Sequence, residues 1–171
     1  GYKLVPVAKA VNQQMGVYSK KVKSLKDLKN GARVGIPNDP TNGSRALMVL
    51  AEQGLITLKA GAGARASVLD ITANPKKLKF VELEAAQLAR SLDDLDAAAV
   101  NSSYAVAAGL KPQGDSLALE DVNTPYVTVL IATRAGHEKD ADLQAFVKAY
   151  QSPEVAAFIA TTFKGAYTPA W

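Results

Sequence analysis

The stretch Ile36-Pro-Asn-Asp-Pro-Thr-Asn-Gly-Ser-Arg-Ala-Leu-Met-Val-Leu-Ala-Glu-Gln-Gly-Leu-Ile56 contains the end of a strand, a loop and a helix in immediate succession. It predicts a strand over Arg33–Ile36, which stops at Pro37, and a helix over Ser44–Gln53. Gly54 ends that helix in the manner of a C′ glycine. A strand that runs through a turn-rich loop into a helix is typical of the α/β class.

The loop before this helix predicts a site for a small anion. Such a loop directs backbone N–H groups and the positive end of a helix dipole toward whatever lies above it. Arg45 falls in the first turn of the expected helix, where its guanidinium fork can grip a carboxylate with two hydrogen bonds. Asn42 lies in the same loop. A plain capped helix with a solvated arginine is the alternative interpretation of these residues.

Composition places the chain among ordinary soluble globular proteins. Its 171 residues suffice for one core, or for one lobe and part of a second, and 48% are hydrophobic and 21% charged. The formal charge of +4 is spread along the chain. The densest basic run, Lys20 to Lys29, alternates with apolar residues and lacks a nucleic-acid motif, so we expect a solvated face and no nucleic-acid partner. Absence of cysteine excludes disulfides and thiolate chemistry.

No apolar stretch is long enough to span a membrane, and the longest ones are strand-sized. No signal peptide or lipid-attachment sequence opens the chain. Gly1 to Val7 instead predicts an immediate β strand, as if the chain started inside a domain. We therefore expect the chain as written to be soluble.

The remaining sequence continues the alternation of short strands and capped helices, which predicts an α/β fold with a largely parallel sheet. Ligands bind at the carboxyl ends of the strands in such sheets. The loops Asn38–Arg45 and Asn101–Tyr104 both leave a strand at such an end. The expected strands are 3–8, 15–19, 33–36, 78–83, 97–100 and 125–133, and the last two expected helices are 141–151 and 153–163.

Catalytic and metal motifs fail on inspection. Gly61 to Arg65 superficially resembles a dinucleotide loop but lacks the third glycine. His137, the only histidine, has no partners for a metal site or a catalytic triad nearby. Glu82 and Glu84 share a strand face without an electrophile or metal beside them. We predict a protein that is not an enzyme and has no metal and no cofactor.

Several long segments resemble the NlpA-like methionine-binding lipoproteins, the substrate-binding components of bacterial methionine ABC importers. The resemblance runs along essentially the whole chain. It is carried by Ile-Pro-Asn-Asp-Pro-Thr-Asn-Gly-Ser-Arg-Ala-Leu (36–47), Asn-Pro-Lys-Lys-Leu-Lys (74–79), Val-Glu-Leu-Glu-Ala-Ala-Gln-Leu (81–88), Arg-Ser-Leu-Asp-Asp (90–94), Glu-Asp followed by Pro-Tyr-Val (120–127), Lys-Ala-Tyr-Gln-Ser-Pro-Glu-Val (148–155) and Gly-Ala-Tyr-Thr-Pro-Ala-Trp (165–171).

This resemblance implies a type II periplasmic-binding-protein fold, in which an amino acid is held in a cleft between two lobes. Residues 22–124 would form one complete α/β lobe. Residues 1–21 and 125–171 would be crossing strands and terminal helices of the other, partial lobe. The resemblance also implies the membrane subunits of an ABC importer as partners, and a periplasmic location with a lipid anchor on an N-terminal portion that family members carry before the position of Gly1.

Departures from the family pattern gather at cleft positions. Where the family commonly reads Thr-His-Val-Glu-Pro, residues 10–14 read Ala-Val-Asn-Gln-Gln. Arg45 and Asn101 are retained, whereas Ser103 and Thr128 replace asparagines of the family pattern. We predict that a methionine-like amino acid binds in this cleft, with weaker affinity or a different ligand preference than in the family. The predicted contacts are Arg45, Asn101, Asn42, Ser103 and Thr128. Loss of a glutamate near an ammonium group removes on the order of 1.5–3 kcal/mol.

A second hypothesis is an isolated or engineered lobe that acts as a self-associating scaffold without binding a ligand. Strands without their N-terminal neighbours would expose sheet edges and an apolar face. We expect the chain either to form a homodimer through these elements or to close its own core. The apolar side chains concerned are Val5, Val7, Val127, Val129, Ile131, Phe146, Val147, Phe158, Ile159 and Phe163.

Overall fold

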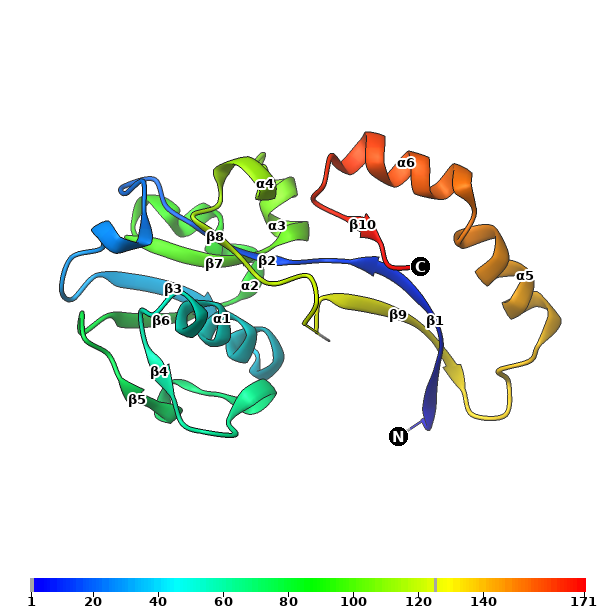
Figure 1. Cartoon of the computed structure of the whole chain (residues 1–171), viewed down its shortest axis with the longest axis horizontal. Coiled ribbons are helices and arrows are strands. Elements are labelled where there is room, and N and C mark those ends of the chain that lie inside the picture. The colour runs from blue at the N-terminus through cyan, green and yellow to red at the C-terminus, as the bar shows by residue number, and fades with distance from the viewer. Residues whose placement is uncertain (1, 125) are drawn as a thin grey trace. The chain divides into compact units, whose positions relative to one another are not determined.

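The computed structural model describes residues 2–124 and 126–171 of the chain (Figure 1). The chain divides into two compact units, a central unit of residues 14–120 and a terminal unit of residues 1–13 and 121–171. The boundaries expected from the sequence lay eight and four residues further along the chain, at 21/22 and 124/125. Strand β2 (Met15–Tyr18) explains the first difference, because it pairs with two strands of the central unit.

The central unit is built on a five-stranded sheet in the order β6-β3-β7-β2-β8. Strand β3 (Arg33–Pro37) runs parallel to β6 (Lys79–Leu83) and to β7 (Ala97–Asn101). Strand β2 runs antiparallel to β7 and to β8 (Ala118–Leu119). The α/β class is confirmed, but the sheet is mixed rather than largely parallel, because β2 lies between two strands of opposite direction.

Both faces of this sheet are covered, and the central strands β3 and β7 are therefore apolar except at their ends, Arg33 and Asn101. Ala97 and Ala99 of β7 belong to one core cluster, whereas Ala98 and Val100 belong to the other. This is the period-two alternation of a strand buried on both sides. Gly35 of β3 is required by the second cluster, because a Cβ atom there would lie 2.6 Å from Leu95 Cδ1.

Helix α1 (Pro40–Glu52) covers the first face, and its buried side chains Leu47 and Leu50 join the cluster that contains Val34 and Ile36. The other helices of this unit are short. The remaining elements of the central unit are α2 (Ala85–Leu88), α3 (Ser102–Ala107), α4 (Pro112–Asp115), β4 (Thr57–Leu58), β5 (Ile71–Ala73) and the 3-10 turns η1 (Leu25–Asp27), η2 (Gly63–Arg65), η3 (Val68–Asp70) and η4 (Arg90–Asp93).

The terminal unit contains a three-stranded antiparallel sheet in the order β10-β1-β9, and Figure 1 shows β1 and β9 side by side. Its strands are β1 (Leu4–Asn12), β9 (Thr128–Arg134) and β10 (Thr168–Pro169). Helices α5 (Ala141–Tyr150) and α6 (Pro153–Phe163) confirm the two terminal helices expected from the sequence. Pro125, the first residue of the last expected strand, lies outside the described residues.

The terminal unit buries few apolar side chains. Among its described residues the buried hydrophobic ones are Ala10, Val127, Ile159 and Ala166. Helix α5 has no buried residue, although its sequence is amphipathic. A packed domain of this size normally buries a contiguous core, so this sheet and its helices leave much apolar surface exposed. Its exposed large apolar residues are Tyr2, Leu4, Val122, Tyr126, Val129, Leu130, Phe146, Phe158 and Trp171.

Candidate functional site

The loop between β3 and α1 ends earlier than the sequence suggested. Asp39 is the N-cap of α1, with its backbone extended (φ −84°, ψ 144°) and its side chain accepting a hydrogen bond from the Asn42 N–H at 2.9 Å. Pro40 occupies the first helical position, where its missing N–H is no loss. The helix expected from Ser44 therefore begins at Pro40, and Arg45 lies in its second turn.

This early start changes the electrostatics of the loop. The Asp39 carboxylate also accepts both hydrogen bonds of the Asn42 side-chain NH₂ group, at 3.0 and 3.1 Å. A carboxylate of the chain itself therefore occupies the positive end of the helix dipole, which is where a bound anion was expected. The prediction that the loop N–H groups offer an open anion site is wrong for the Asn42 N–H.

Close packing holds the start of α1 against the end of β3. The Gly43 N–H donates to the Asp39 carbonyl oxygen at 2.8 Å. A Cβ atom at Gly43 would lie 2.9 Å from the Pro37 carbonyl oxygen, closer than real Cβ atoms approach backbone. Glycine is thus needed here to bring the first turn of the helix down onto the strand end, and this places Arg45 over the sheet.

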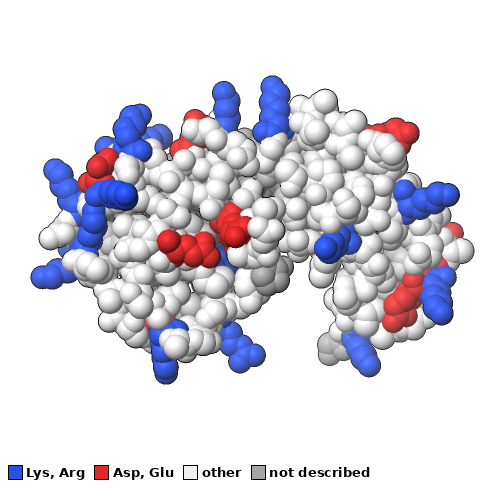
Figure 2. All heavy atoms as spheres, in the orientation of Figure 1, with Lys and Arg blue, Asp and Glu red and all other residues white. Residues whose placement is uncertain are grey.

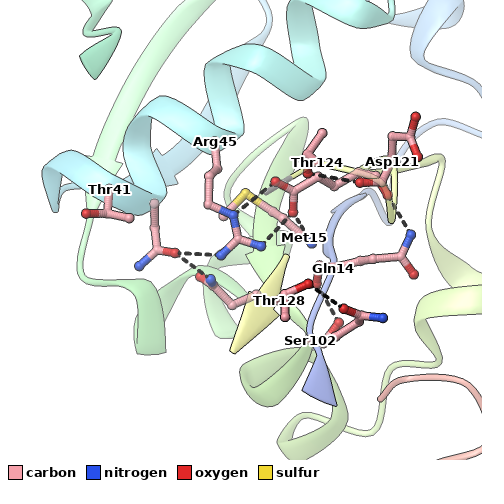
Figure 3. Close-up of polar contacts among 12 residues, drawn as sticks. Gln14, Met15, Thr41, Arg45, Ser102, Asp121, Thr124 and Thr128 are labelled. Atoms are coloured by element: carbon pink, nitrogen blue, oxygen red, sulfur yellow. Dashed lines mark hydrogen bonds and ion pairs between the residues drawn. The ribbon is translucent and has the colours of Figure 1, made fainter. Parts of the chain in front are cut away.

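Arg45 is buried and paired with an acidic side chain. Its Nε donates to Glu120 Oε1 at 3.0 Å and its Nη2 donates to Glu120 Oε2 at 2.6 Å. The exposed fractions of the two side chains are 9% for Arg45 and 2% for Glu120. Figure 3 shows Arg45 reaching from α1 toward Met15, with interactions on both sides of its guanidinium group. Arg45 is thus neither solvated nor a lone cation.

Asn42 connects Arg45 to Asn101. Its side-chain oxygen accepts from Arg45 Nη1 at 3.2 Å and from Asn101 Nδ2 at 2.8 Å. The amide orientation is fixed, because the NH₂ group of Asn42 faces the Asp39 carboxylate and its oxygen faces two donors. Three of the five residues predicted from the sequence therefore form one continuous polar chain.

This chain ends on an acceptor without a donor. Asn101 Oδ1 is buried and has no hydrogen-bond partner among the described residues. Leaving a buried carbonyl oxygen unpaired costs about 1–3 kcal/mol. Such an atom marks either a place for a small polar molecule or a strained core position, and here it lies at the carboxyl end of β7, where α/β sheets bind ligands.

The loop expected at Asn101–Tyr104 is absent, because α3 begins at Ser102 directly after β7, and Ser102 anchors this junction. Ser102, which is 1% exposed, donates through Oγ to the Gln14 carbonyl oxygen at 2.5 Å, and its backbone N–H donates to the same oxygen. Ser103, the predicted site residue, is partly exposed. Neither Ser102 nor Glu120 was among the site residues predicted from the sequence. Glu120 is 75 residues from Arg45 in the chain, so no local pattern could join them.

Thr128, the fifth predicted site residue, belongs to the terminal unit. It is the first residue of β9, and its hydroxyl donates to Asn12 Oδ1 at 2.8 Å. Asn12 in turn donates to Thr168 Oγ1 at 3.4 Å. These contacts join the three strands of the terminal sheet, and they give Thr128 a structural role within its own unit.

Charges on the face drawn in Figure 2 are dispersed. On the face in Figure 2, Lys and Arg side chains lie at several separate places with acidic side chains among them. Asp96 accepts a 2.7 Å hydrogen bond from the Arg33 backbone N–H, which lowers the pKa of its carboxyl, with Lys21 adding to the effect. Burial raises the pKa of the Tyr18 hydroxyl, and Asp115 raises it further.

Within residues 2–124 and 126–171, no three histidine, cysteine or acidic side chains lie close enough together to hold a metal ion. In the same ranges, no helix has the length and apolar character needed to cross a bilayer.

Comparisons with known proteins identify a family. The model of the NlpA lipoprotein family matches residues 1–171. D-methionine-binding lipoprotein MetQ of Salmonella typhimurium is 47% identical over 173 residues, which cover all of this chain and 64% of that protein. The chain spans 63–64% of the length of such curated relatives.

Solved structures agree with the fold expected from the sequence. A nutrient-binding protein from Burkholderia cenocepacia bound to methionine superposes with a TM-score of 0.95 at 51% identity, over all of this chain and 72% of that one. A periplasmic substrate-binding protein of an ABC transporter from Coxiella burnetii gives 0.92 at 45% identity, over 99% of this chain and 71% of that one. The α/β periplasmic-binding-protein fold is confirmed.

Proposed function

Because the chain belongs to the NlpA lipoprotein family, we propose that it binds a small amino acid of methionine-like chemistry and performs no catalysis. The supporting relatives are those named for D-methionine binding and for a bound methionine. In this proposal the central unit is a complete lobe, and the terminal unit supplies part of a second lobe.

The observation that carries this proposal is the polar chain Glu120–Arg45–Asn42–Asn101 with its unpaired end. A zwitterionic amino acid requires a cationic donor for its carboxylate and acceptors for its ammonium group. Asn101 Oδ1 is a buried acceptor with no donor in residues 2–124 and 126–171, and the ligand ammonium group would supply that donor. A ligand carboxylate would accept a hydrogen bond from Arg45 Nη1, which also donates to Asn42 Oδ1.

The same chain of polar side chains explains why a ligand carboxylate would bind more weakly here than at an arginine without acidic neighbours. Asp39 and Glu120 contribute two carboxylates and Arg45 one cation, so the formal charge of this cluster is −1. Such a cluster does not attract a carboxylate by net charge. Ser103, in the same unit as Asn101, would add a hydroxyl group as a further contact. We therefore propose binding that is weakened or redirected toward ligands recognised mainly through their ammonium and side-chain groups.

The relatives also suggest the setting. The Coxiella burnetii neighbour is named as part of an ABC transporter in the periplasm. We propose that the protein to which this sequence belongs works in the periplasm with the membrane subunits of such an importer, and that it is anchored there as a lipoprotein.

A thermal-shift screen against the twenty amino acids in both enantiomers tests the proposal. A ligand at 100 times its Kd stabilises the folded state by about 2.7 kcal/mol, which raises the melting temperature by several degrees. Stabilisation by methionine or a close analogue, lost in Asn101→Ala, is the expected result. No stabilisation by any amino acid would contradict the proposal.

The exposed apolar surface of the terminal unit favours a second candidate, self-association. Phe158 of α6 is 59% exposed, Phe146 of α5 54% and Leu130 of β9 52%. Large apolar side chains exposed together in one unit commonly mark an interaction site. We propose that the isolated chain forms homodimers or higher assemblies through this surface. Light scattering across a concentration series tests this, and a strictly monomeric chain at every concentration would contradict it.

A further inference from the structure

Glu120 follows β8 directly and is the last residue of the central unit. We propose that Glu120 is a positioning residue of the candidate site, which fixes the guanidinium group of Arg45 so that Arg45 holds Asn42, and Asn42 holds Asn101. This inference rests on the amino-acid-binding function proposed above, and it identifies a residue that acts on the ligand only through others.

Three donors converge on the Glu120 carboxylate. Oε1 accepts from Arg45 Nε, and Oε2 accepts from Arg45 Nη2 and, at 3.0 Å, from the Met15 backbone N–H. Two parallel hydrogen bonds from one edge of a guanidinium group determine the plane and direction of that group. The opposite corner, Nη1, is thereby directed at Asn42.

The backbone of Glu120 is held as firmly as its side chain. Its N–H donates to the Met15 carbonyl oxygen at 2.9 Å, and its carbonyl oxygen accepts from Gln14 Nε2 at 2.5 Å. Gln14 also accepts the hydrogen bonds of Ser102, next to Asn101. Gln14 and Met15, at the start of β2, therefore fix both the carboxylate that orients Arg45 and the junction of β7 and α3 that carries Asn101.

From Arg45 the constraint passes to the unpaired acceptor. Asn42 Oδ1 receives both Arg45 Nη1 and Asn101 Nδ2. Because the Asn101 amide is planar, fixing its nitrogen on Asn42 also fixes the direction of its Oδ1, the proposed contact of the ligand ammonium group. A rotation of the guanidinium group would release Asn42 and, with it, that orientation.

Glu120→Gln is a sharp test, because it keeps the size of the side chain and removes one acceptor. A glutamine offers one oxygen and one NH₂ group to the three donors. Whichever way the amide is turned, its NH₂ group faces Arg45 Nε–H, or faces Arg45 Nη2 and the Met15 N–H. At least one hydrogen bond that orients Arg45 is therefore replaced by two donors facing each other.

The experiment measures the affinity of the whole chain for methionine and for methioninamide, which lacks the carboxylate, in the unchanged protein, in E120Q and in D93N. Asp93 pairs with Lys20 on the surface, and its side chain is 71% exposed, so D93N removes the same charge away from the site. We expect E120Q to bind methionine about tenfold more weakly or worse, with its preference for methionine over methioninamide reduced. D93N should leave both affinities unchanged.

An E120Q protein with unchanged affinity and unchanged preference would overturn the inference. Weaker binding by E120Q with the side-chain amide signals of Asn42 and Asn101 unmoved would also overturn it, because the loss would then not pass through these two amides. If E120Q does not fold, E120D, whose carboxylate is one methylene group shorter, carries the same comparison.

NMR of the side-chain amides of Asn42 and Asn101 separates this inference from the proposed function. If the unchanged protein binds neither compound, the proposed function fails. The positioning role then stands if these two amide signals shift between the unchanged protein and E120Q in the absence of ligand, and it fails if they do not.

Discussion

Replacing Arg45 by methionine tests the energetic role of the buried ion pair. R45M removes the guanidinium hydrogen bonds to Glu120, at 3.0 and 2.6 Å, and to Asn42, at 3.2 Å, and it leaves the carboxylate of Glu120, 2% exposed, without its counter-ion. Breaking a buried pair on one side costs about 3–5 kcal/mol, because a charge stays buried and uncompensated. We expect a loss of this size in the free energy of unfolding.

Urea unfolding followed by far-UV circular dichroism measures this loss. With a slope of about 2 kcal/mol/M, a loss of 3–5 kcal/mol moves the midpoint down by roughly 1.5–2.5 M. The double variant R45M/E120L should recover most of the stability, because apolar replacement of both partners is often neutral or stabilising. The matched control is Lys20→Met, which removes the exposed partner of Asp93 and should cost less than about 1 kcal/mol.

Two outcomes would refute the reasoning. If R45M lowers the free energy of unfolding by no more than Lys20→Met does, then removing Arg45 does not leave a buried, uncompensated charge on Glu120. If R45M/E120L is as unstable as R45M, the loss comes from misfitted packing around position 45 rather than from the carboxylate left behind.

Two further predictions concern the central sheet. Gly35→Ala should destabilise the chain by about 1–3 kcal/mol in the same urea assay, because the added Cβ would lie 2.6 Å from Leu95 Cδ1 and 2.8 Å from Leu88 Cδ2; an unchanged midpoint would show that both leucines move aside freely. The Arg33 backbone N–H lowers the pKa of the Asp96 carboxyl in the folded state. The Asp96 carboxylate therefore stabilises the fold at pH values above its unfolded pKa of about 3.9. This contribution disappears as the pH falls through the lower pKa of the folded state. Asp96→Asn should therefore be less stable than the unchanged protein at pH 7 and approach it in stability at acid pH, and a pH-independent difference would contradict this.

Much of the fold could be predicted from the sequence, where the signals are local. Helices α5 and α6 begin and end close to the predicted residues, because Ser152, Pro153 and Gly165 mark the boundaries of α6. The start of α1 was missed although Asp39-Pro40 is a valid N-cap and first-turn pair, because both residues are also typical of turns. The sequence predicted a strand at 15–19 but not its pairing with β7 and β8. Pairing partners, unlike strand propensity, depend on residues far along the chain.

The distinction between local signals and contacts of distant residues also applies to the candidate site. Asn42 and Asn101 meet because β3 and β7 are parallel neighbours, with Val34 opposite Ala97, and ligand loops gather at the carboxyl ends of such strands. Sequence reasoning could use that rule. The pairing of Arg45 with Glu120 follows no rule of spacing, since the three-dimensional fold alone brings together residues 75 positions apart.

Isothermal titration calorimetry of the chain with L- and D-methionine, beside Asn101→Ala and the control Asn74→Ala, tests the central claim most directly. Asn74 makes two side-chain hydrogen bonds with Leu78 in the same unit and lies outside the candidate site, so its variant controls for loss of stability. We predict saturable binding of methionine by the unchanged protein and by Asn74→Ala, and a loss of at least about tenfold in affinity, or 1.4 kcal/mol, in Asn101→Ala. Binding that is unaffected by Asn101→Ala, or no binding of either enantiomer by the unchanged protein, would contradict the account.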